Sequence, residues 1–461
     1  MSHNFEKNWT NQNNGYPLND EEVQRYISVV PSARQYRHSQ TPFYCFIHFG
    51  MNTATGREWG AGTETAMDFT VKSIKPAQWV KHIKAAGAKG IILTCKHHDG
   101  FCLWPTKYSN FSVKYSTFTG DIVGMVADEC RNQGLFFGVY LSPWDMHEKT
   151  YGTPEYNDYF CNQLRELLTN YGEIREVWFD GAKGANARAF EYDWERYYKL
   201  IRELQPNANI AICGPDIRWV GNEGGKTRKS EFSVVPASLC LAETVSKHSQ
   251  HAEGEAEKLK KITSTDEDLG SRAVLAKNGD LCWYPAEVDV SIRKGWFWSK
   301  AGNSTVKSGK KLFKLYLDSV GKNCTFLLNV PPTDKGVIHR KDAKALKNLG
   351  KRIEEMTAFP VIVEKLGELT ENDGYIDFDF DSQKKLKYVI IKEDIRKSQR
   401  VEAFDIYIKK ANGKYKKAAS ETVIGSCRII TLKRRAKCVG ARLVIRQSRS
   451  TPIISEIGFY E

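Results

Sequence analysis

The sequence predicts an α/β fold, a (β/α)8 TIM-like barrel followed by a C-terminal β-sandwich domain. Over the first three-quarters of the chain, short apolar runs alternate with amphipathic stretches, which is typical of parallel strands joined by helical crossovers. About eight such runs occur within roughly 330 residues, the strand number of a TIM barrel. Beyond about residue 358, strand-like runs follow one another without helices, which is typical of a β-sandwich.

Each expected barrel strand is a short apolar run, and helical patterns lie between several of these runs. The helix expected at Pro76–Ala86 begins with proline, which is favoured at a first helical position, and ends before Gly87. The helix expected at Asp121–Gln133 begins with aspartate, a favoured N-cap residue, and stops at Gly134. Asn157–Tyr171 and Asp193–Leu204 show similar patterns. The eight expected strands are Phe43–Phe49, Gly90–Thr94, Leu135–Leu141, Glu176–Phe179, Asn209–Cys213, Ser238–Leu241, Leu281–Tyr284 and Cys324–Val330.

The pattern changes after the last of these runs. A helix is expected at about His339–Met356, and four strand-like runs with polar breaks follow it. We therefore predict a catalytic barrel over residues 1–345 and a β-sandwich domain over residues 346–461. The four runs of the second domain are Tyr388–Ile391, Ala403–Ile408, Arg428–Leu432 and Ala441–Ile445.

The composition is that of an ordinary soluble globular protein, with 41% hydrophobic and 27% charged residues. We find no run of about 18 apolar residues, so no membrane partner is expected. The segment Met1–Asp20 is polar and does not look like a signal peptide. The eleven cysteines include no closely spaced pair, which favours a reducing compartment over a disulfide framework. We expect a cytoplasmic protein, or a secreted or periplasmic one if a signal peptide has been removed.

The net charge is +13, and the excess is greatest after residue 340. A basic surface can attract nucleic acid or anionic glycans. The basic clusters here are short and carry no nucleic-acid-binding motif, so we interpret them as solvated surface and expect no nucleic-acid partner. The sequence leaves the oligomeric state open.

Histidines, carboxylates and aromatic residues follow the expected barrel strands. Because a TIM barrel places its active site at the C-terminal ends of its strands, these side chains should converge on one rim. Trp and Tyr faces pack against sugar rings, while His, Asp and Arg bind hydroxyl groups. The residues in question are His48, His97, His98, Asp99, Tyr140, Trp144, Asp180, Asp216, Arg218 and Glu223.

Cleavage of a glycosidic bond needs two carboxyl groups that flank it. Asp180 is the first candidate because it ends an apolar strand, where a carboxylate would be rigidly held. An aspartate before glycine can also form a simple turn or a helix cap. His97 and His98 could be structural or could bind a metal, but neighbouring strand side chains point to opposite faces. We therefore expect no metal and no cofactor.

Several long motifs, in the right order, resemble those of glycoside hydrolase family 29, the α-L-fucosidases. The resemblance covers about residues 35–345. It implies a barrel with a C-terminal β-sandwich and hydrolysis of α-L-fucosides. The motifs are Phe46-Ile47-His48-Phe49-Gly50, Lys96-His97-His98-Asp99-Gly100-Phe101, Gly138-Val139-Tyr140-Leu141-Ser142-Pro143-Trp144, Glu176-Val177-Trp178-Phe179-Asp180-Gly181 and Leu327-Leu328-Asn329-Val330-Pro331-Pro332.

The resemblance also implies roles for individual residues. Asp180 would be the nucleophile that forms a covalent fucosyl-enzyme. Trp298 would line the pocket around the fucose methyl group. The fucose hydroxyls and ring would be held by His48, His97, His98 and Tyr140.

Two further stretches resemble the subfamily that acts on α-1,3/1,4-linked fucose in branched, Lewis-type glycans. The first, Arg218-Trp219-Val220-Gly221-Asn222-Glu223-Gly224-Gly225, implies that Glu223 is the acid/base. The second, Arg57-Glu58-Trp59-Gly60, implies substrate-binding roles for Glu58 and Trp59. The expected enzyme is a retaining exo-α-L-fucosidase whose partner is a fucosylated oligosaccharide or glycoconjugate.

Three other interpretations remain open from the sequence. The first is a broad-specificity fucosidase that accepts α-1,2 and α-1,6 linkages. The second is a non-catalytic carbohydrate-binding protein on the same barrel. The third is a metal-dependent hydrolase that uses His97, His98 and Asp99.

Overall fold

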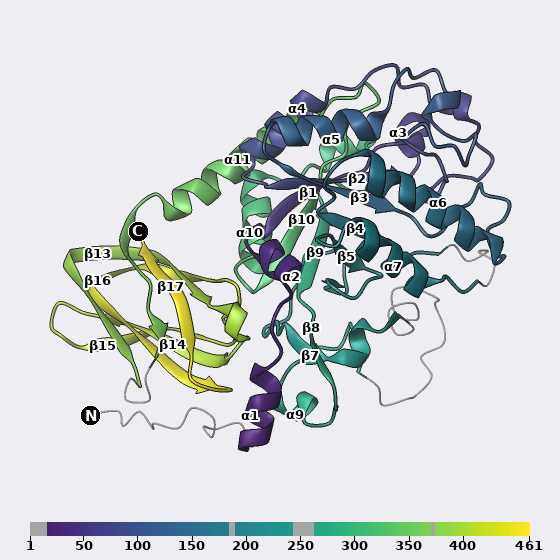
Figure 1. The fold of residues 1–461 in the computed structure, drawn as a ribbon. Helices are drawn as coiled ribbons and strands as arrows, with labels where there is room; N and C mark the ends of the chain where they lie inside the picture. The colour runs from purple at the N-terminus through teal and green to yellow at the C-terminus, as the bar shows by residue number, and fades with distance from the viewer. Residues whose placement is uncertain (1–15, 184–189, 243–261, 370–373) are drawn as a thin grey trace.

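The computed structural model describes residues 16–183, 190–242, 262–369 and 374–461, with only the backbone described at 433–436. Most of the polar N-terminal segment considered above therefore lies outside the described residues. Figure 1 shows an α/β barrel, coloured purple to green, beside an antiparallel β domain coloured green to yellow. The predicted fold class is confirmed.

Eight strands form one parallel sheet, in the order β5-β4-β3-β2-β1-β10-β9-β6. A parallel bridge between Ala211 and Ile217 joins β5 to the segment entering β6, so the sheet nearly closes into a barrel. Parallel pairing brings the carboxyl ends of all these strands to one rim. The strands are β1 Phe43–Ile47, β2 Gly90–Lys96, β3 Phe136–Leu141, β4 Glu176–Phe179, β5 Asn209–Ile212, β6 Arg218–Trp219, β9 Ala286–Ser291 and β10 Cys324–Asn329.

Two of the eight predicted barrel strands are wrong. Ser238–Leu241 lies mostly in a 3-10 helix, η3 (Ala237–Cys240). Leu281–Tyr284 does contain a strand, β8 (Leu281–Trp283), but it pairs with β7 (Val234–Pro236) in a separate two-stranded sheet. The barrel uses β6 and β9 instead. Neither forms an apolar run, because β6 has two residues and β9 carries the buried carboxyl groups of Glu287 and Asp289.

The predicted helices begin and end within two residues of their expected positions, and their caps explain why. Pro76 opens α4, and the Asp121 side chain accepts a hydrogen bond of 2.9 Å from the Gly124 N–H at the start of α5. Gly134 has φ 70°, which ends α5 at little conformational cost. The helices are α1 Asp20–Ile27, α2 Ala33–Ser39, α3 Met51–Thr55, α4 Pro76–Ala85, α5 Ile122–Asn132, α6 Glu155–Asn170, α7 Trp194–Leu204, α9 Arg272–Leu275, α10 Gly309–Ser319 and α11 Arg340–Thr357.

The inside of the barrel is packed with side chains and contains several aromatic rings. Tyr44, Phe46, Tyr140 and Trp178 belong to one buried apolar cluster there. The rings of Tyr140 and Trp178 are stacked with centroids 5.3 Å apart. This cluster forms a rigid base, above which the polar rim residues stand.

The second domain is a seven-stranded antiparallel sheet around its own apolar core. Register shifts interrupt the long strands β13 and β16 where they pair with each other. The four strand-like runs predicted for this domain lie within β13, β14 and β16. The strands are β11 Pro360–Glu364, β12 Gly367–Glu368, β13 Ile376–Glu393, β14 Val401–Lys409, β15 Tyr415–Glu421, β16 Arg428–Ser448 and β17 Ile453–Tyr460.

Helix α11 leads from the barrel to the β domain (Figure 1), as the sequence predicted. The division at residues 345/346 stays a prediction and falls inside this helix. A buried ion pair between Arg272 and Glu402 also joins the two domains. Glu402 of β14 accepts hydrogen bonds from Arg272 of α9 at 2.7 Å and from Arg449 at 3.1 Å.

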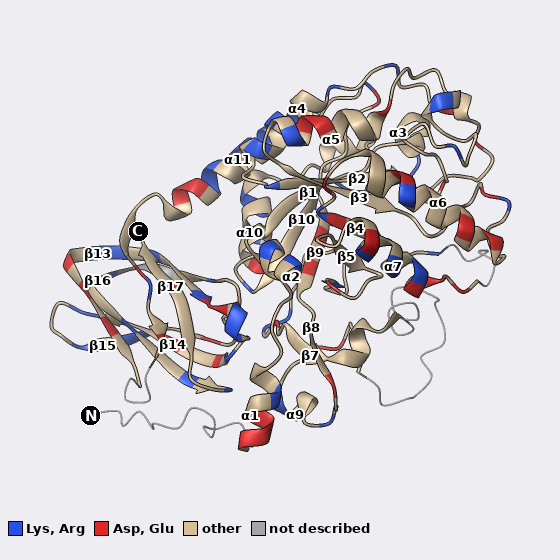
Figure 2. Cartoon of the chain, viewed as in Figure 1, with Lys and Arg blue, Asp and Glu red and all other residues tan. Residues whose placement is uncertain are grey.

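Charged residues of both signs are spread over the outer helices (Figure 2). α11, for example, carries lysines and arginines along its first turns and glutamates near its end. This mixture agrees with the interpretation of the basic residues as solvated surface. Among the described residues, no helix combines the length and apolar character needed to cross a membrane.

Candidate active site

A pocket of about 110 Å³ opens at the carboxyl ends of the barrel strands. Phe46, Trp178 and Ile212 from the barrel interior contribute its apolar lining. Polar and aromatic side chains from the strand ends and the following loops complete it. The polar lining residues are His48, His97, His98, Asp180, Glu223 and Asp289, and the indoles are those of Trp59, Trp219 and Trp296.

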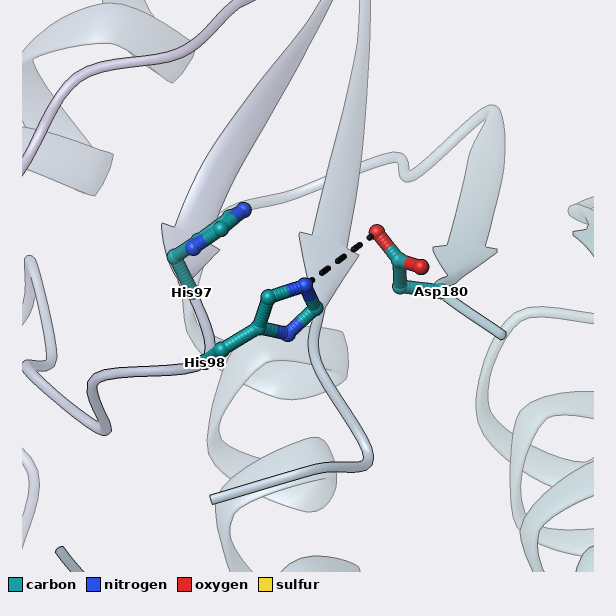
Figure 3. A group of neighbouring side chains, drawn as sticks. All are labelled: His97, His98 and Asp180. Carbon is teal, nitrogen blue, oxygen red and sulfur yellow. Dashed lines mark ion pairs between the residues drawn. The ribbon is translucent and has the colours of Figure 1, made fainter. Parts of the chain in front are cut away.

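Asp180 follows β4 directly, and both of its carboxylate oxygens are held. The Tyr140 hydroxyl donates to Oδ2 at 2.8 Å, and the Ala182 N–H donates to Oδ1 at 2.7 Å. The His98 Nε2 atom lies 3.8 Å from Oδ2 (Figure 3). The Asp180 side chain is 22% exposed. The carboxylate is therefore oriented by the protein but still reachable from the pocket.

Ser142 determines the tautomer of His98. Its hydroxyl donates its one proton to the Trp144 carbonyl at 2.6 Å, so it must accept from His98 Nδ1 at 2.7 Å. The proton on Nδ1 leaves Nε2 as an acceptor that faces Asp180. Burial lowers the pKa of His98, although the Asp180 carboxylate opposes this effect, so the ring is neutral.

Asn329 orients His48 in the same way. Its amide nitrogen donates to the Trp296 carbonyl at 2.8 Å, which directs its carbonyl oxygen toward His48 Nδ1 at 3.0 Å. His48 therefore carries its proton on Nδ1 and keeps Nε2 as an acceptor. Burial lowers the pKa of His48 to about 3, which keeps the ring neutral.

His97 has the opposite arrangement. The Asn52 amide nitrogen donates to Asp99 at 3.0 Å and faces His97 Nδ1 at 3.4 Å. Nδ1 is therefore the acceptor, and Nε2 carries the proton. Burial holds the pKa of His97 well below its usual value, and His98 and His48 lower it further. The three histidines thus offer two acceptors and one donor, a pattern that suits the hydroxyl groups of a sugar.

Glu223 lies on an exposed loop after β6 and lines the same pocket as Asp180. The Trp296 indole N–H donates to its carboxylate at 3.3 Å. Glu58, which is exposed and does not line the pocket, accepts from the backbone N–H of Trp296 at 2.6 Å. Burial raises the pKa of Glu58 against the N–H groups that bond its charged form. Glu58 therefore binds the backbone of Trp296, and Glu223 binds its indole.

Trp59 stands at the mouth of the pocket and is 47% exposed. Its ring lies edge-on to His98 at 5.5 Å and to Trp144 at 5.2 Å. Aromatic neighbours therefore hold the indole while much of its surface remains open to a ligand.

Not all predicted site residues reach the pocket surface. Tyr140 is fully buried and acts on the pocket through its bond to Asp180. Trp298, expected around the fucose methyl group, does not line this pocket, and its indole N–H donates to the Asn303 side chain at 3.2 Å. Trp296 lines the pocket in its place. The segment carries aromatic residues at 296, 297 and 298, and the sequence does not show which of them turns inward.

Sequence reasoning did not assign site roles to Trp178, Trp219 or Asp289, all of which line the pocket. For Trp178 and Asp289, the alternation of side chains along a strand could have indicated the pocket. Side chains two residues apart share a strand face, so Trp178 stands on the same side as Asp180. The same alternation places Glu287 and Asp289 on the inner face of β9, once β9 is known to be a strand.

The donor atoms of His97, His98 and Asp180 lie within 4.8 Å of one another, which is close enough to hold a metal ion. A second such group, His38, Glu176 and Glu287, is buried in the barrel. The first group belongs to the pocket, so a metal and a sugar would compete for the same atoms. Without a metal, the pocket offers an oriented carboxylate, a second carboxylate and a set of neutral hydroxyl-binding groups.

Comparison with known proteins agrees with this geometry. Residues 8–356 match the family model described as α-L-fucosidase. The chain is 34% identical to α-L-fucosidase 1 of Arabidopsis thaliana over 470 residues, covering 94% of this chain and 88% of the plant protein.

Two solved structures are similar over nearly the whole chain. A glycoside hydrolase 29 family member from an unknown rumen bacterium is 36% identical with a TM-score of 0.81, covering 94% of this chain and 77% of that one. A Ruminococcus gnavus GH29 fucosidase in complex with fucose is 27% identical with a TM-score of 0.80, covering 99% and 98%. The chain therefore belongs to glycoside hydrolase family 29 and is an α-L-fucosidase.

Proposed function

We propose that this α-L-fucosidase removes terminal α-1,3- or α-1,4-linked L-fucose from branched, Lewis-type glycans by double displacement, with retention of the anomeric configuration. The observation that carries the mechanism is the placement of Asp180 at the end of β4, with both oxygens hydrogen-bonded, in the pocket that Glu223 also lines. Retaining glycosidases need two carboxyl groups of this kind.

In the proposed reaction, the Asp180 carboxylate attacks the anomeric carbon while Glu223 gives a proton to the departing glycosidic oxygen. Glu223 then removes a proton from the water that attacks the fucosyl-enzyme, and Asp180 leaves. The Tyr140 hydroxyl and the Ala182 N–H keep the nucleophile in one orientation, which reduces the entropy lost on reaching the transition state.

The size of the pocket supports exo action. Its volume of about 110 Å³ is well below the roughly 300–1,000 Å³ of sites for larger ligands. It suits one terminal sugar, and the Ruminococcus gnavus relative binds fucose. The rest of the glycan would then lie at the mouth, near the exposed faces of Trp59 and the Glu223 loop.

Support for the linkage preference comes from the Glu58-Trp59 and Glu223 stretches, which resemble those of the α-1,3/1,4 subfamily. Trp59 has an open aromatic face at the pocket mouth, where the sugar next to fucose would stack. Because Trp59 would contact this second sugar, the enzyme would bind a branched substrate better than a simple aryl fucoside.

Replacement of Asp180 tests the mechanism. Asp180→Ala should lower kcat by about 10⁴-fold or more, because a nucleophile is lost. Asp128→Asn, at an exposed carboxylate of α5, is the matched control and should keep the wild-type rate. NMR of the first product should show the configuration of the substrate. Wild-type turnover by Asp180→Ala, or an inverted first product, would disprove double displacement at Asp180.

A panel of fucosylated oligosaccharides tests the linkage. Lewis-type trisaccharides with α-1,3 or α-1,4 fucose should be cleaved with a higher kcat/KM than α-1,2- or α-1,6-linked compounds. Equal rates on all linkages would instead establish a broad-specificity fucosidase. Binding of fucose without any turnover would indicate a carbohydrate-binding protein.

A further inference from the structure

A third carboxyl group stands in the pocket beside Asp180 and Glu223. Asp289 lies on β9, where Glu287, Asp289 and Ser291 share the inner face. Glu287 is fully buried and accepts from the Trp178 indole at 2.8 Å. Asp289 lies nearer the rim, is 4% exposed and lines the pocket. Its strand pairs with β10 on one side and β6 on the other, which makes Asp289 a rigid anchor.

Asp289 accepts a hydrogen bond of 2.7 Å from the indole N–H of Trp219. Trp219 ends β6, which has only two residues and pairs with β9 at Arg218 and Trp219. The next backbone hydrogen bond between the two strands joins the Val220 N–H to the Glu287 carbonyl at 2.9 Å. The side chain of Asp289 therefore holds the strand end from which the Glu223 loop departs.

Glu223 is four residues beyond Trp219 in the sequence. The loop between them contains Gly221, with φ 102°, and is closed by Asn222, whose side-chain oxygen accepts from the Gly224 and Lys226 N–H groups. This local structure makes the loop compact. A displacement of Trp219 would consequently be passed on to Glu223.

We propose that Asp289 is a positioning residue of the fucosidase reaction, whose carboxylate holds the Trp219 indole and thereby sets the place of Glu223 over the pocket. The inference rests on the proposed role of Glu223 as acid/base. Two indole N–H groups thus hold carboxyl groups that line the pocket: that of Trp219 binds Asp289, and that of Trp296 binds Glu223.

The charges around Asp289 give the proposal a second measurable consequence. The titratable groups that face it are Glu223 from the β6 loop, Asp180 after β4 and Glu287 on its own strand. Burial raises the pKa of Asp289 to about 7, and the charges of Glu223 and Asp180 add to this, while the Trp219 N–H opposes it. The effect is mutual, so a charge on Asp289 also opposes ionisation of Glu223.

Two substrates separate positioning of an acid from binding of fucose. A Lewis-type trisaccharide has a poor leaving group and needs the proton, whereas an aryl fucoside with an acidic phenol does not. Asp289→Ala should lower kcat/KM for the trisaccharide by about 10- to 100-fold and for the aryl fucoside by less than about threefold. Trp219→Phe, which keeps an aromatic ring but removes the N–H, should show the same contrast.

Asp289→Asn separates the hydrogen bond from the charge, since its amide oxygen can still accept from Trp219. It should retain most of the trisaccharide rate at acidic pH. The basic limb of its kcat/KM profile should move to lower pH, because Glu223 then loses its proton more readily. This variant also keeps the test valid if Asp289→Ala does not fold.

Equal losses on both substrates would overturn the proposal, because they would assign Asp289 to fucose binding or to the fold. Wild-type rates on both substrates in Asp289→Ala would overturn it as well. Glu223→Ala is measured in parallel. If that variant keeps the wild-type trisaccharide rate, the proposed function itself fails, and the positioning role fails with it. Asp128→Asn on α5 is again the neutral control.

Discussion

At the scale of single residues, two histidines of the pocket are each held in one tautomer by a neighbouring side chain that can only accept their proton. Ser142 gives its proton to a carbonyl, so it must accept from His98. Asn329 is oriented by the Trp296 carbonyl, so it must accept from His48. Since burial also keeps these rings neutral, each histidine presents one defined acceptor atom to a ligand.

Ser142→Ala tests this arrangement. The change removes the acceptor for His98 Nδ1, so the ring can adopt the other tautomer and lose its acceptor toward the sugar. We expect kcat/KM to fall by about tenfold, the worth of about one hydrogen bond. Steady-state kinetics on a fucosylated trisaccharide measure this. Thr169→Ala on α6 is the control, and an unchanged kcat/KM in Ser142→Ala would contradict the tautomer argument.

A chelator tests whether His97, His98 and Asp180 act as metal ligands. In the proposed mechanism Asp180 attacks carbon directly, so activity should remain within about twofold after prolonged EDTA treatment and desalting. The assay is turnover before and after treatment. Loss of activity that zinc restores would assign these donor atoms to a metal and would remove Asp180 as the nucleophile.

At the scale of secondary-structure elements, short strands and their ends set the site. β4 has four residues, and the next residue is Asp180. β5 ends at Ile212 with φ 67°, an unfavourable conformation for a β-branched residue, where its N–H donates to the Ile217 carbonyl at 3.0 Å. This strained residue lies next to the bridge that closes the barrel, and it lines the pocket.

Gly138 of β3 allows β2, β3 and β4 to approach one another. A Cβ atom at this position would lie 2.3 Å from Ile92 Cδ1 and 2.8 Å from the Glu176 carbonyl oxygen. The backbone oxygen cannot move without disturbing the β3–β4 pairing, so Gly138→Ala should destabilise the protein by about 1–3 kcal/mol. Urea unfolding measures this. Gly279→Ala, which meets no atom within 4 Å, is the control, and equal stability of the two variants would contradict the steric argument.

At the scale of the whole molecule, the barrel centre holds a buried polar cluster below the pocket. His38 Nδ1 lies 3.4 Å from a Glu176 oxygen, and the Tyr44 hydroxyl donates to Glu287. Burial raises the pKa of Glu176 to about 8 and that of Glu287 well above its usual value, and it lowers the pKa of His38 to about 3. At neutral pH the cluster is therefore uncharged.

This cluster makes stability depend on pH. Between about pH 4.5 and 8 the unfolded chain has released the Glu176 proton while the folded protein keeps it, so the free energy of unfolding falls as pH rises. Glu176→Gln removes the contribution of Glu176 to this dependence, because an amide does not titrate, while the contribution of Glu287 remains. The variant should therefore lose less stability than wild type between pH 5 and pH 8, by on the order of a few kcal/mol. Denaturant unfolding at the two pH values measures this, and parallel curves for both proteins would contradict the assignment.

The amino-acid sequence by itself determined the class of fold and most of the site. Apolar runs, caps and glycines predicted six barrel strands and the helices around them, because these features act locally. The polar residues at the strand ends were also readable, since parallel strands bring their carboxyl ends together. The motifs around His48, His97 and Asp180 then led to the family.

Only the tertiary structure decided which residues line the pocket together. β9 was missed because its inward carboxyl groups interrupt the apolar pattern. The place of Asp289 in the pocket was missed for the same reason. The choice of Trp296 over Trp298, and the bond between Asp289 and Trp219, depend on how loops far apart in the chain pack against each other. Such contacts leave no periodic signal along the sequence, because they are set by the closed barrel and not by the neighbours of each residue.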